Sequence, residues 1–227
     1  MKVNVMIKSS IIIKKVFAHQ VLNSLGHPAL QCWIQLSDGS LHGASVPSGT
    51  SVGQYEVKET QDLMNCHSSP TMYQACKHIS TLWNKHLTGM TPDVQKIDAL
   101  LETELPLAGN IALAISYAVT RAQAHVEGVQ VYELIAQFMN GMPSLPSCMF
   151  NLINGGVHAN GGIAFQECLV IPSGSLSLFE EMQWAVRILE YLPRFCKTLA
   201  VTCTTGLEGG YVLSTQQKSP GVTGSTY

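Results

Sequence analysis

The chain carries little charge, since Asp, Glu, Lys and Arg together make up only 12% of its 227 residues and the formal net charge is −2. Without a basic surface, neither nucleic acid nor an anionic membrane is expected as a partner. Long apolar runs are also absent, so we predict no membrane-spanning helix. Apolar residues nevertheless make up 46% of the chain, which is enough for a hydrophobic core and argues against a disordered protein.

Cysteines spaced for a metal site are missing as well. The chain has seven cysteines, an odd number, and no C-x-x-C pair: Cys32, Cys66, Cys76, Cys148, Cys168, Cys196 and Cys203. A zinc site or a disulfide framework is therefore poorly supported, and buried reduced thiols are the better interpretation. Reduced thiols predict a cytoplasmic protein. The lysine-interrupted start of the chain also lacks the apolar core and cleavage site of a signal peptide.

Strand patterns come first along the chain. Residues 30–36 and 41–46 have the composition of two strands, and Asp38-Gly39 between them predicts a β-hairpin. Together with residues 11–17, these strands predict a small antiparallel sheet.

Helical patterns follow the strands. Apolar residues recur at three- and four-residue steps, which predicts helices over residues 72–83, 92–101, 110–125 and 131–138. The alanine-rich helix over 110–125 is expected to be buried on most sides. A strand group followed by a helix group predicts an α+β domain over residues 1–140.

A second segment begins after Pro143 and Pro146, which mark a linker. Short apolar strands are predicted over 148–153 and 168–171, and a helix with one apolar side over 178–192. We assign residues 141–213 to this segment. Residues 214–227 show no periodicity and few apolar side chains, which predicts a disordered tail.

The most informative motif is Asn154-Gly155-Gly156-Val157-His158-Ala159-Asn160, followed by Glu167. Two glycines allow the backbone to approach a small ligand closely. Glu167 falls on an apolar strand that we expect to be buried, where a carboxylate must be paired, bound to a metal or functional. Taken alone, His158 is better explained as a structural loop histidine, and only the whole motif favours a functional role.

This motif and several others, in the same order along the chain, resemble the enolase family of phosphopyruvate hydratases. The other blocks are Leu22-Asn23-Ser24-Leu25-Gly26-His27-Pro28, Val46-Pro47-Ser48-Gly49-Thr50-Ser51-Val52-Gly53 with Glu56, Glu59 and Asp62, Gly109-Asn110, Ser116-Tyr117-Ala118 with Arg121-Ala122, and Gly206-Leu207-Glu208-Gly209-Gly210. The resemblance implies an α+β N-terminal domain followed by an α/β (TIM-like) barrel, of which this chain holds the opening part.

The resemblance also implies a reaction, the dehydration of 2-phosphoglycerate to phosphoenolpyruvate in glycolysis. By resemblance, Glu208 is the acid that protonates the leaving hydroxide, and His158 contacts the substrate. Glu167 lies near the same oxygen and holds Glu208 protonated, because two carboxylates in one site raise the pKa of one of them.

Magnesium is the cofactor that the resemblance implies. Ser51, on a loop that closes over the substrate between Gly49 and Gly53, is implied as a ligand of Mg²⁺, which favours oxygen ligands and substrate phosphates. Without the family match, Ser51 would be read as part of an ordinary surface loop and Glu208 as a solvated turn residue.

Other groups that the resemblance implies are not found in this sequence. The family's lysine base and three metal-binding carboxylates follow the position of Glu208, whereas here no Asp occurs after Asp98. Asn23, Leu25, Gln61 and Leu207 stand where the family has charged residues. We therefore expect a divergent, C-terminally truncated member with an incomplete barrel and no activity alone.

Three interpretations of function remain open at this point. The chain is an enolase by descent that needs a missing half from another polypeptide, or a non-catalytic module that pairs with a full-length enolase or with itself as a homodimer. The third is a different enzyme that uses Glu167, Glu208 and His158, but nothing in the sequence supplies a replacement base and electrophile.

Overall fold

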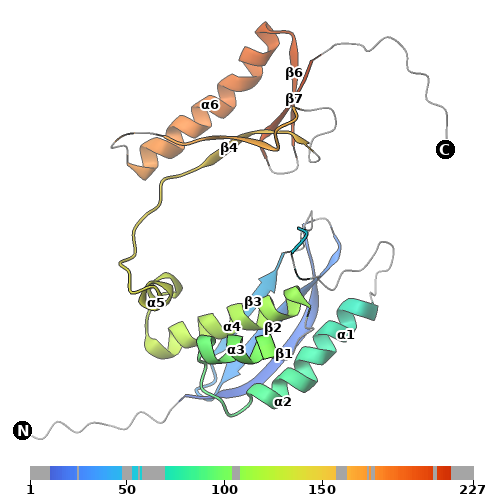
Figure 1. Cartoon of the computed structure of the whole chain (residues 1–227), viewed down its shortest axis with the longest axis vertical. Coiled ribbons are helices and arrows are strands. Elements are labelled where there is room, and N and C mark those ends of the chain that lie inside the picture. Colours follow the sequence, from blue (N-terminus) through green and yellow to red (C-terminus); the bar gives the residue numbers. More distant parts are fainter. Residues whose placement is uncertain are drawn as a thin grey trace, which may run out of the picture. The chain divides into compact units, whose positions relative to one another are not determined.

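The computed structural model of the chain describes residues 11–24, 26–47, 53–55, 57, 70–103, 108–156, 163–172, 174, 177–206 and 209–215. The chain divides into two compact units, Met1–Pro143 (unit 1) and Ser144–Tyr227 (unit 2) (Figure 1). Within the described residues, no helix combines the length and the apolar composition needed to cross a membrane.

Unit 1 begins with the predicted antiparallel sheet. Its strands β1 (Ile13–Leu22), β2 (Pro28–Leu36) and β3 (Leu41–Val46) pair in the order β1-β2-β3. The predicted hairpin is confirmed: Asp38 Oδ1 accepts hydrogen bonds from N and Oγ of Ser40 at 2.9 and 2.7 Å. Gly39 has a φ of 90°, which glycine adopts without steric cost and which closes the turn.

The helices of unit 1 also follow the predicted pattern. They are α1 (Pro70–His78), the π-helical turn η1 (Ile79–Trp83), α2 (Asn84–Leu87), α3 (Val94–Thr103), α4 (Gly109–Glu127) and α5 (Val131–Phe138). In α5 the N-cap Gln130 and the third helical residue, Glu133, form a capping box, which satisfies backbone N–H groups at the helix start. α4 is buried on most sides, as predicted, and only one stripe of the helix is exposed, where Leu113 and Tyr117 are 42% and 46% exposed.

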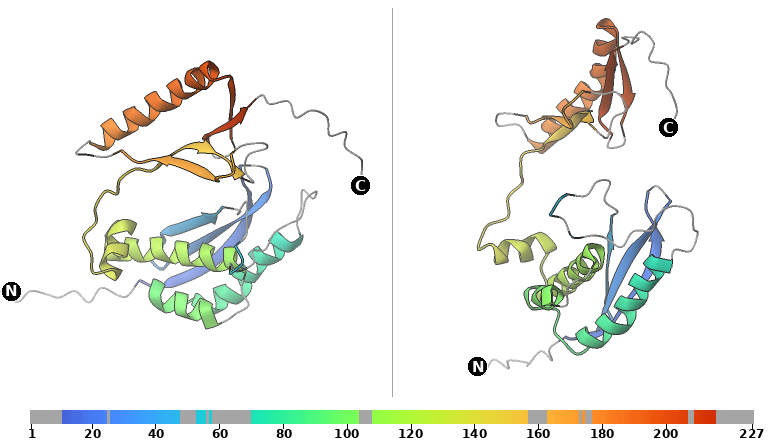
Figure 2. Two further views of the ribbon diagram at one scale, coloured as in Figure 1. Left: turned by 45° about the horizontal axis from the view of Figure 1, so that its top comes forward. Right: turned by 45° about the vertical axis from the view of Figure 1, so that its right-hand side comes forward.

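The core of unit 1 lies between one face of the sheet and the helices that cover it (Figure 2). Alternate residues of β2 point into this core, namely Leu30, Cys32, Ile34 and Leu36, each at most 1% exposed. Opposite them lie Trp83 of η1 and the apolar face of α4. The side chains that β2 presents at every second residue therefore pack against those that α4 presents at every third or fourth residue.

The free edge of β1 is closed by side chains of the first helical segment. Asn84 Oδ1 accepts a hydrogen bond from Val16 N at 2.8 Å, and Ser80 Oγ accepts one from Ala18 N at 3.0 Å. Ser80 Oγ in turn donates to Cys76 O at 2.8 Å. These contacts satisfy backbone groups of an edge strand that would otherwise need water or another strand.

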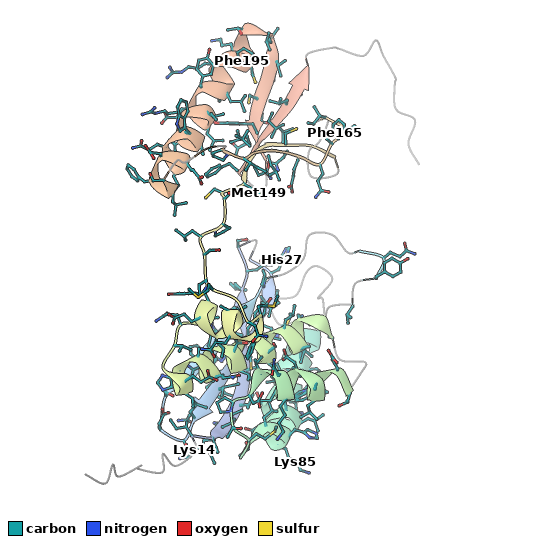
Figure 3. The ribbon with its side chains drawn as sticks, turned by 60° about the vertical axis from the view of Figure 1, so that its left-hand side comes forward. Lys14, His27, Lys85, Met149, Phe165 and Phe195 are labelled. Atoms are coloured by element: carbon teal, nitrogen blue, oxygen red, sulfur yellow. The ribbon has the colours of Figure 1, made fainter. Side chains whose placement is uncertain are left out.

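We expect Asn84→Ala to lower the free energy of unfolding of unit 1 by about 2 kcal/mol, because it leaves the N–H of a buried residue without an acceptor. Val16 is fully buried, so water cannot replace Asn84 readily. Lys85→Ala, one residue further along α2 and exposed, is the matched control (Figure 3). Urea denaturation followed by circular dichroism measures both variants, and equal stability of the two would refute the role of Asn84.

Unit 2 contains β4 (Phe150–Asn154), β5 (Glu167–Val170), α6 (Leu178–Thr198), β6 (Val201–Thr205) and β7 (Tyr211–Thr215). The sheet order is β5-β4-β7-β6. β4 pairs antiparallel with β5 and parallel with β7, and β6 pairs antiparallel with β7. The sheet is therefore mixed, and these strands do not close a barrel.

Three features of unit 2 go beyond the sequence predictions. Neither β6 nor β7 was predicted, and β7 includes residues 214 and 215 of the segment assigned to the tail. α6 continues to Thr198 through Pro193, past the predicted end at Leu192. The helix start is as predicted and is fixed by a capping box, in which Ser177 N donates to Glu180 Oε2 at 2.8 Å.

The described cysteines are free thiols, in line with the sequence prediction, but only three of them are buried: Cys32, Cys76 and Cys196. Burial raises the pKa of Cys32 to about 12 and that of Cys76 to about 11. Cys168 is exposed on β5, so the expectation of burial is wrong for this residue. Cys66 lies outside the described residues.

Candidate functional site

The candidate site lies at the end of β4 in unit 2. The last residue of that strand, Asn154, is paired across the sheet with Glu167 of β5 on one side and with Val212 of β7 on the other. The end of β4, which precedes Gly155 and Gly156, therefore lies beside β7, which follows Gly209 and Gly210.

Asn154 is almost completely buried, with 1% of its surface exposed. Its side chain packs against the glycine turn that joins β6 to β7. A Cβ added to Gly210 would lie 2.5 Å from Oδ1 of Asn154, and one added to Gly206 would lie 2.9 Å from it. Both distances are shorter than a van der Waals contact, so glycine is required at both positions.

The turn between Gly206 and Gly210 is held by its own backbone. Gly206 N donates to Gly210 O at 2.7 Å, and Gly209 N donates to Gly206 O at 3.2 Å. Gly209 has a φ of 86°, a conformation that favours glycine. These contacts explain why three glycines surround Glu208 in the sequence and fix the two ends of the segment that carries it.

A second glycine turn follows Asn154 directly. Gly155 N donates to Gln166 O at 2.7 Å, and Gly156 N donates to Ile163 O at 2.8 Å. These two bonds hold both ends of the segment that contains His158 next to the start of β5. The segments that carry His158 and Glu208 thus both begin beside Asn154.

The structure corrects one expectation about Glu167. The residue lies on a strand, as predicted, but all of β5 is exposed, so the expectation of a buried strand is wrong. The reason is the sheet order, which places β5 at an edge. A carboxylate at an exposed position does not require a partner, so burial no longer supports a functional role for this residue.

Three predicted site residues lie outside the described residues: Ser51, His158 and Glu208. Ser51 belongs to unit 1, whereas the other two belong to unit 2. Of the four predicted residues, the structure therefore describes only Glu167, together with the glycines that flank His158 and Glu208.

Sequence reasoning missed Asn154 as a part of this site. The signal was a polar residue at the end of an apolar strand, immediately before two glycines. A buried side-chain amide must be hydrogen-bonded or enclosed by polar groups, and here it packs against the turn between Gly206 and Gly210.

The described residues do not assemble a magnesium site. No group of three or more His, Cys, Asp and Glu side chains among them is placed to hold a metal ion. Around Asn154 the described part of the chain offers one carboxylate, Glu167, whereas Mg²⁺ prefers near-octahedral oxygen coordination. Magnesium chemistry therefore cannot be derived from these residues.

Unit 1 contains a separate cavity of about 400 Å³ between α3, α4 and α5, lined by both apolar and polar side chains. Asp98 and Arg121 are among its lining residues. Burial raises the pKa of Asp98, and a hydrogen bond with Ser116 opposes this shift. Arg121 Nη1 donates to the carbonyl of Gly43 on β3, which gives this arginine a structural role.

Comparison with known proteins gives the family. Residues 13–135 match the family model "Enolase, N-terminal domain", and residues 142–223 match "Enolase, C-terminal TIM barrel domain". The chain is 31% identical over 208 residues to a protein named enolase from Wolinella succinogenes. That alignment covers 88% of this chain and 49% of the relative, so the chain spans about half the length of this curated protein.

Proposed function

This chain belongs to the enolase family, and we propose that it carries the acid and substrate-binding side of a site that converts 2-phosphoglycerate to phosphoenolpyruvate. The observation that supports the proposal is the arrangement around Asn154. The glycine turn before His158 begins directly after this residue, the glycine turn around Glu208 packs against its side chain, and Glu167 lies beside it on β5. We place the reaction in the cytoplasm, where thiols stay reduced.

The proposed roles follow from the chemistry of the dehydration. Hydroxide is a poor leaving group and must be protonated as it departs, so the site needs a carboxylic acid at that oxygen. We assign this role to Glu208. Glu167 would raise the pKa of Glu208 by like-charge repulsion and so keep it protonated. His158 would hold the substrate by a hydrogen bond.

The other half of the chemistry needs a base that removes a weakly acidic proton, and positive charge that stabilises the resulting anion. Ser51 would contribute one oxygen to Mg²⁺, and the ion supplies positive charge beside the substrate when it is bound. No group of three acidic side chains among the described residues is placed to hold a metal ion. We propose that the base and the carboxylates come from barrel strands other than β4, β5, β6 and β7.

The alternative is a non-catalytic module that pairs with a full-length enolase or with the remaining barrel strands. It is supported by the continuous hydrophobic core of unit 1, which is built entirely from residues before Pro143. A unit with its own core can bind a partner without the barrel.

The test is an assay of phosphoenolpyruvate formation from 2-phosphoglycerate and Mg²⁺. The purified chain is assayed alone and with a polypeptide that carries the remaining strands of an enolase barrel. We expect turnover only in the mixture, and Glu208→Gln should lower kcat by about 100-fold or more, because an amide cannot supply the proton. Glu190→Gln on the exposed side of α6 is the control and should leave kcat unchanged.

The other outcomes discriminate between the interpretations. Turnover by the chain alone would overturn the need for further barrel strands. No turnover in a mixture that forms a complex would overturn the catalytic proposal and favour the module.

A further inference from the structure

The cavity between α3, α4 and α5 has two walls of different chemical character. The three helices are neighbours in unit 1 (Figure 1). Val131, Ile135 and Phe138 of α5, spaced by four and three residues, form an apolar wall. A second wall comes from α3 and carries the polar side chains of Gln95 and Asp98. A volume of about 400 Å³ is typical of small-molecule sites, which combine apolar surface with a few placed polar groups.

Asp98 is a half-buried carboxylate that its surroundings satisfy only in part. The hydroxyl of Ser116 on α4 hydrogen-bonds to this carboxyl group, but Oδ1 has no hydrogen-bond partner among the described residues. Burial raises the pKa of Asp98, and the nearby charge of Glu102 raises it as well. Carboxylates removed from water are normally paired or fully hydrogen-bonded, so the α3 wall has acceptor capacity left for a ligand.

No basic side chain of the described residues neutralises this wall. Arg121 also lines the cavity, but its Nη1 donates to the carbonyl of Gly43 on β3. Within the described part of the chain, Asp98 forms no ion pair. Glu102, one helical turn after Asp98 on α3, adds a second negative charge whose field reaches the Asp98 carboxyl group. The potential at the α3 wall therefore favours a cation.

We propose that this cavity binds a small primary amine with an apolar body, of the arylalkylamine type. The ammonium group donates to the Asp98 carboxylate, a charge-assisted hydrogen bond of the stronger kind, and the apolar body lies against the α5 wall. An anionic ligand is disfavoured by the charges of Asp98 and Glu102. A purely apolar ligand would displace water from the Asp98 carboxylate without replacing its hydrogen bonds.

The first test is isothermal titration calorimetry of the purified full chain with phenethylamine, for which we expect a dissociation constant in the millimolar range or tighter. Phenethyl alcohol has the same body without the charge, and it should bind at least about tenfold more weakly because it forms no charge-assisted hydrogen bond. Hydrocinnamate, which carries the opposite charge, should not bind. Absence of phenethylamine binding, or equal affinities for the amine and the alcohol, would overturn the proposal.

Asp98→Asn tests the polar wall, since it keeps the shape of the side chain and removes its charge. The affinity for phenethylamine should fall at least about tenfold, whereas the affinity for phenethyl alcohol should change by less than about twofold. Glu190→Gln on α6 of unit 2 removes the same charge outside unit 1 and should leave both affinities unchanged. Urea denaturation followed by circular dichroism checks the fold. An amine affinity equal in the two variants would contradict the proposal.

Two further variants decide the matter where Asp98→Asn fails to fold. Gln95→Glu adds a carboxylate at an exposed position of the α3 wall and should tighten amine binding by about threefold. Ile135→Gln, at a position that is 49% exposed, removes apolar surface from the α5 wall and should weaken the amine and the alcohol by the same factor. An amine affinity that neither variant changes would place binding outside the cavity and refute the proposal.

Discussion

Trp83→Ala should lower the free energy of unfolding of unit 1 by about 4 kcal/mol, the largest stability effect expected in this chain. Trp83 is fully buried and is the largest of the buried side chains. It lies in the π-helical turn between α1 and α2 and belongs to the core cluster that contains Ile34 and Ile115. Its loss removes apolar contacts and leaves a cavity that the surrounding strands and helices cannot fill.

The control for this prediction is the preceding residue. Leu82 is 40% exposed on the outer side of the same turn, and Leu82→Ala should cost less than about 1 kcal/mol. Urea denaturation is followed by circular dichroism and by the fluorescence of Trp33, which remains in both variants. Similar losses in the two variants would mean that Trp83 does not organise the core.

Gly155→Ala should disrupt the candidate site and destabilise unit 2 by about 3 kcal/mol. A Cβ at this position would lie 2.1 Å from Phe165 O and 2.6 Å from Ile163 O. Both atoms belong to the backbone, so no side-chain movement relieves the clash. The start of β5 must move away, and the bond from Gly155 N to Gln166 O is lost.

A control for the glycine-to-alanine change itself is Gly141→Ala in unit 1, because the nearest atoms to a Cβ there are 4.0 Å away. This substitution should leave unit 2 unchanged and be neutral or slightly stabilising for unit 1, since alanine restricts the unfolded chain. Urea denaturation is followed by circular dichroism and by tryptophan fluorescence, to which Trp184 contributes the signal of unit 2. Unchanged unfolding of Gly155→Ala would show that the turn tolerates a side chain and does not fix the end of the His158 segment.

Features that depend only on contacts between neighbouring residues could be predicted from the sequence. The Asp38-Gly39 turn, the limits of α5 and the first residue of α6 depend on contacts within a few residues, and all three were predicted correctly. The family could also be inferred from the sequence, because the glycine-containing and polar blocks that resemble its motifs occur here in the same order as in the family.

The arrangement of unit 2 could not be predicted in this way. β7 pairs in parallel with β4, so that Asn154 meets Val212, and this pairing leaves β5 at the edge. Such a pairing joins residues nearly sixty positions apart, and its stability depends on packing and loop closure rather than on local pattern. The exposure of Glu167 follows from it.

The sequence by itself therefore determined the family of this chain, the two-part organisation and most of the helices and strands of unit 1. Local backbone preferences and the apolar period encode these features residue by residue. Only the tertiary structure decided that Asn154 packs against the turn between Gly206 and Gly210, that the sheet of unit 2 is mixed and open, and that α6 presents exposed aromatic side chains. These features depend on which strands become neighbours and which faces stay uncovered, and such long-range contacts leave no local signature in the sequence.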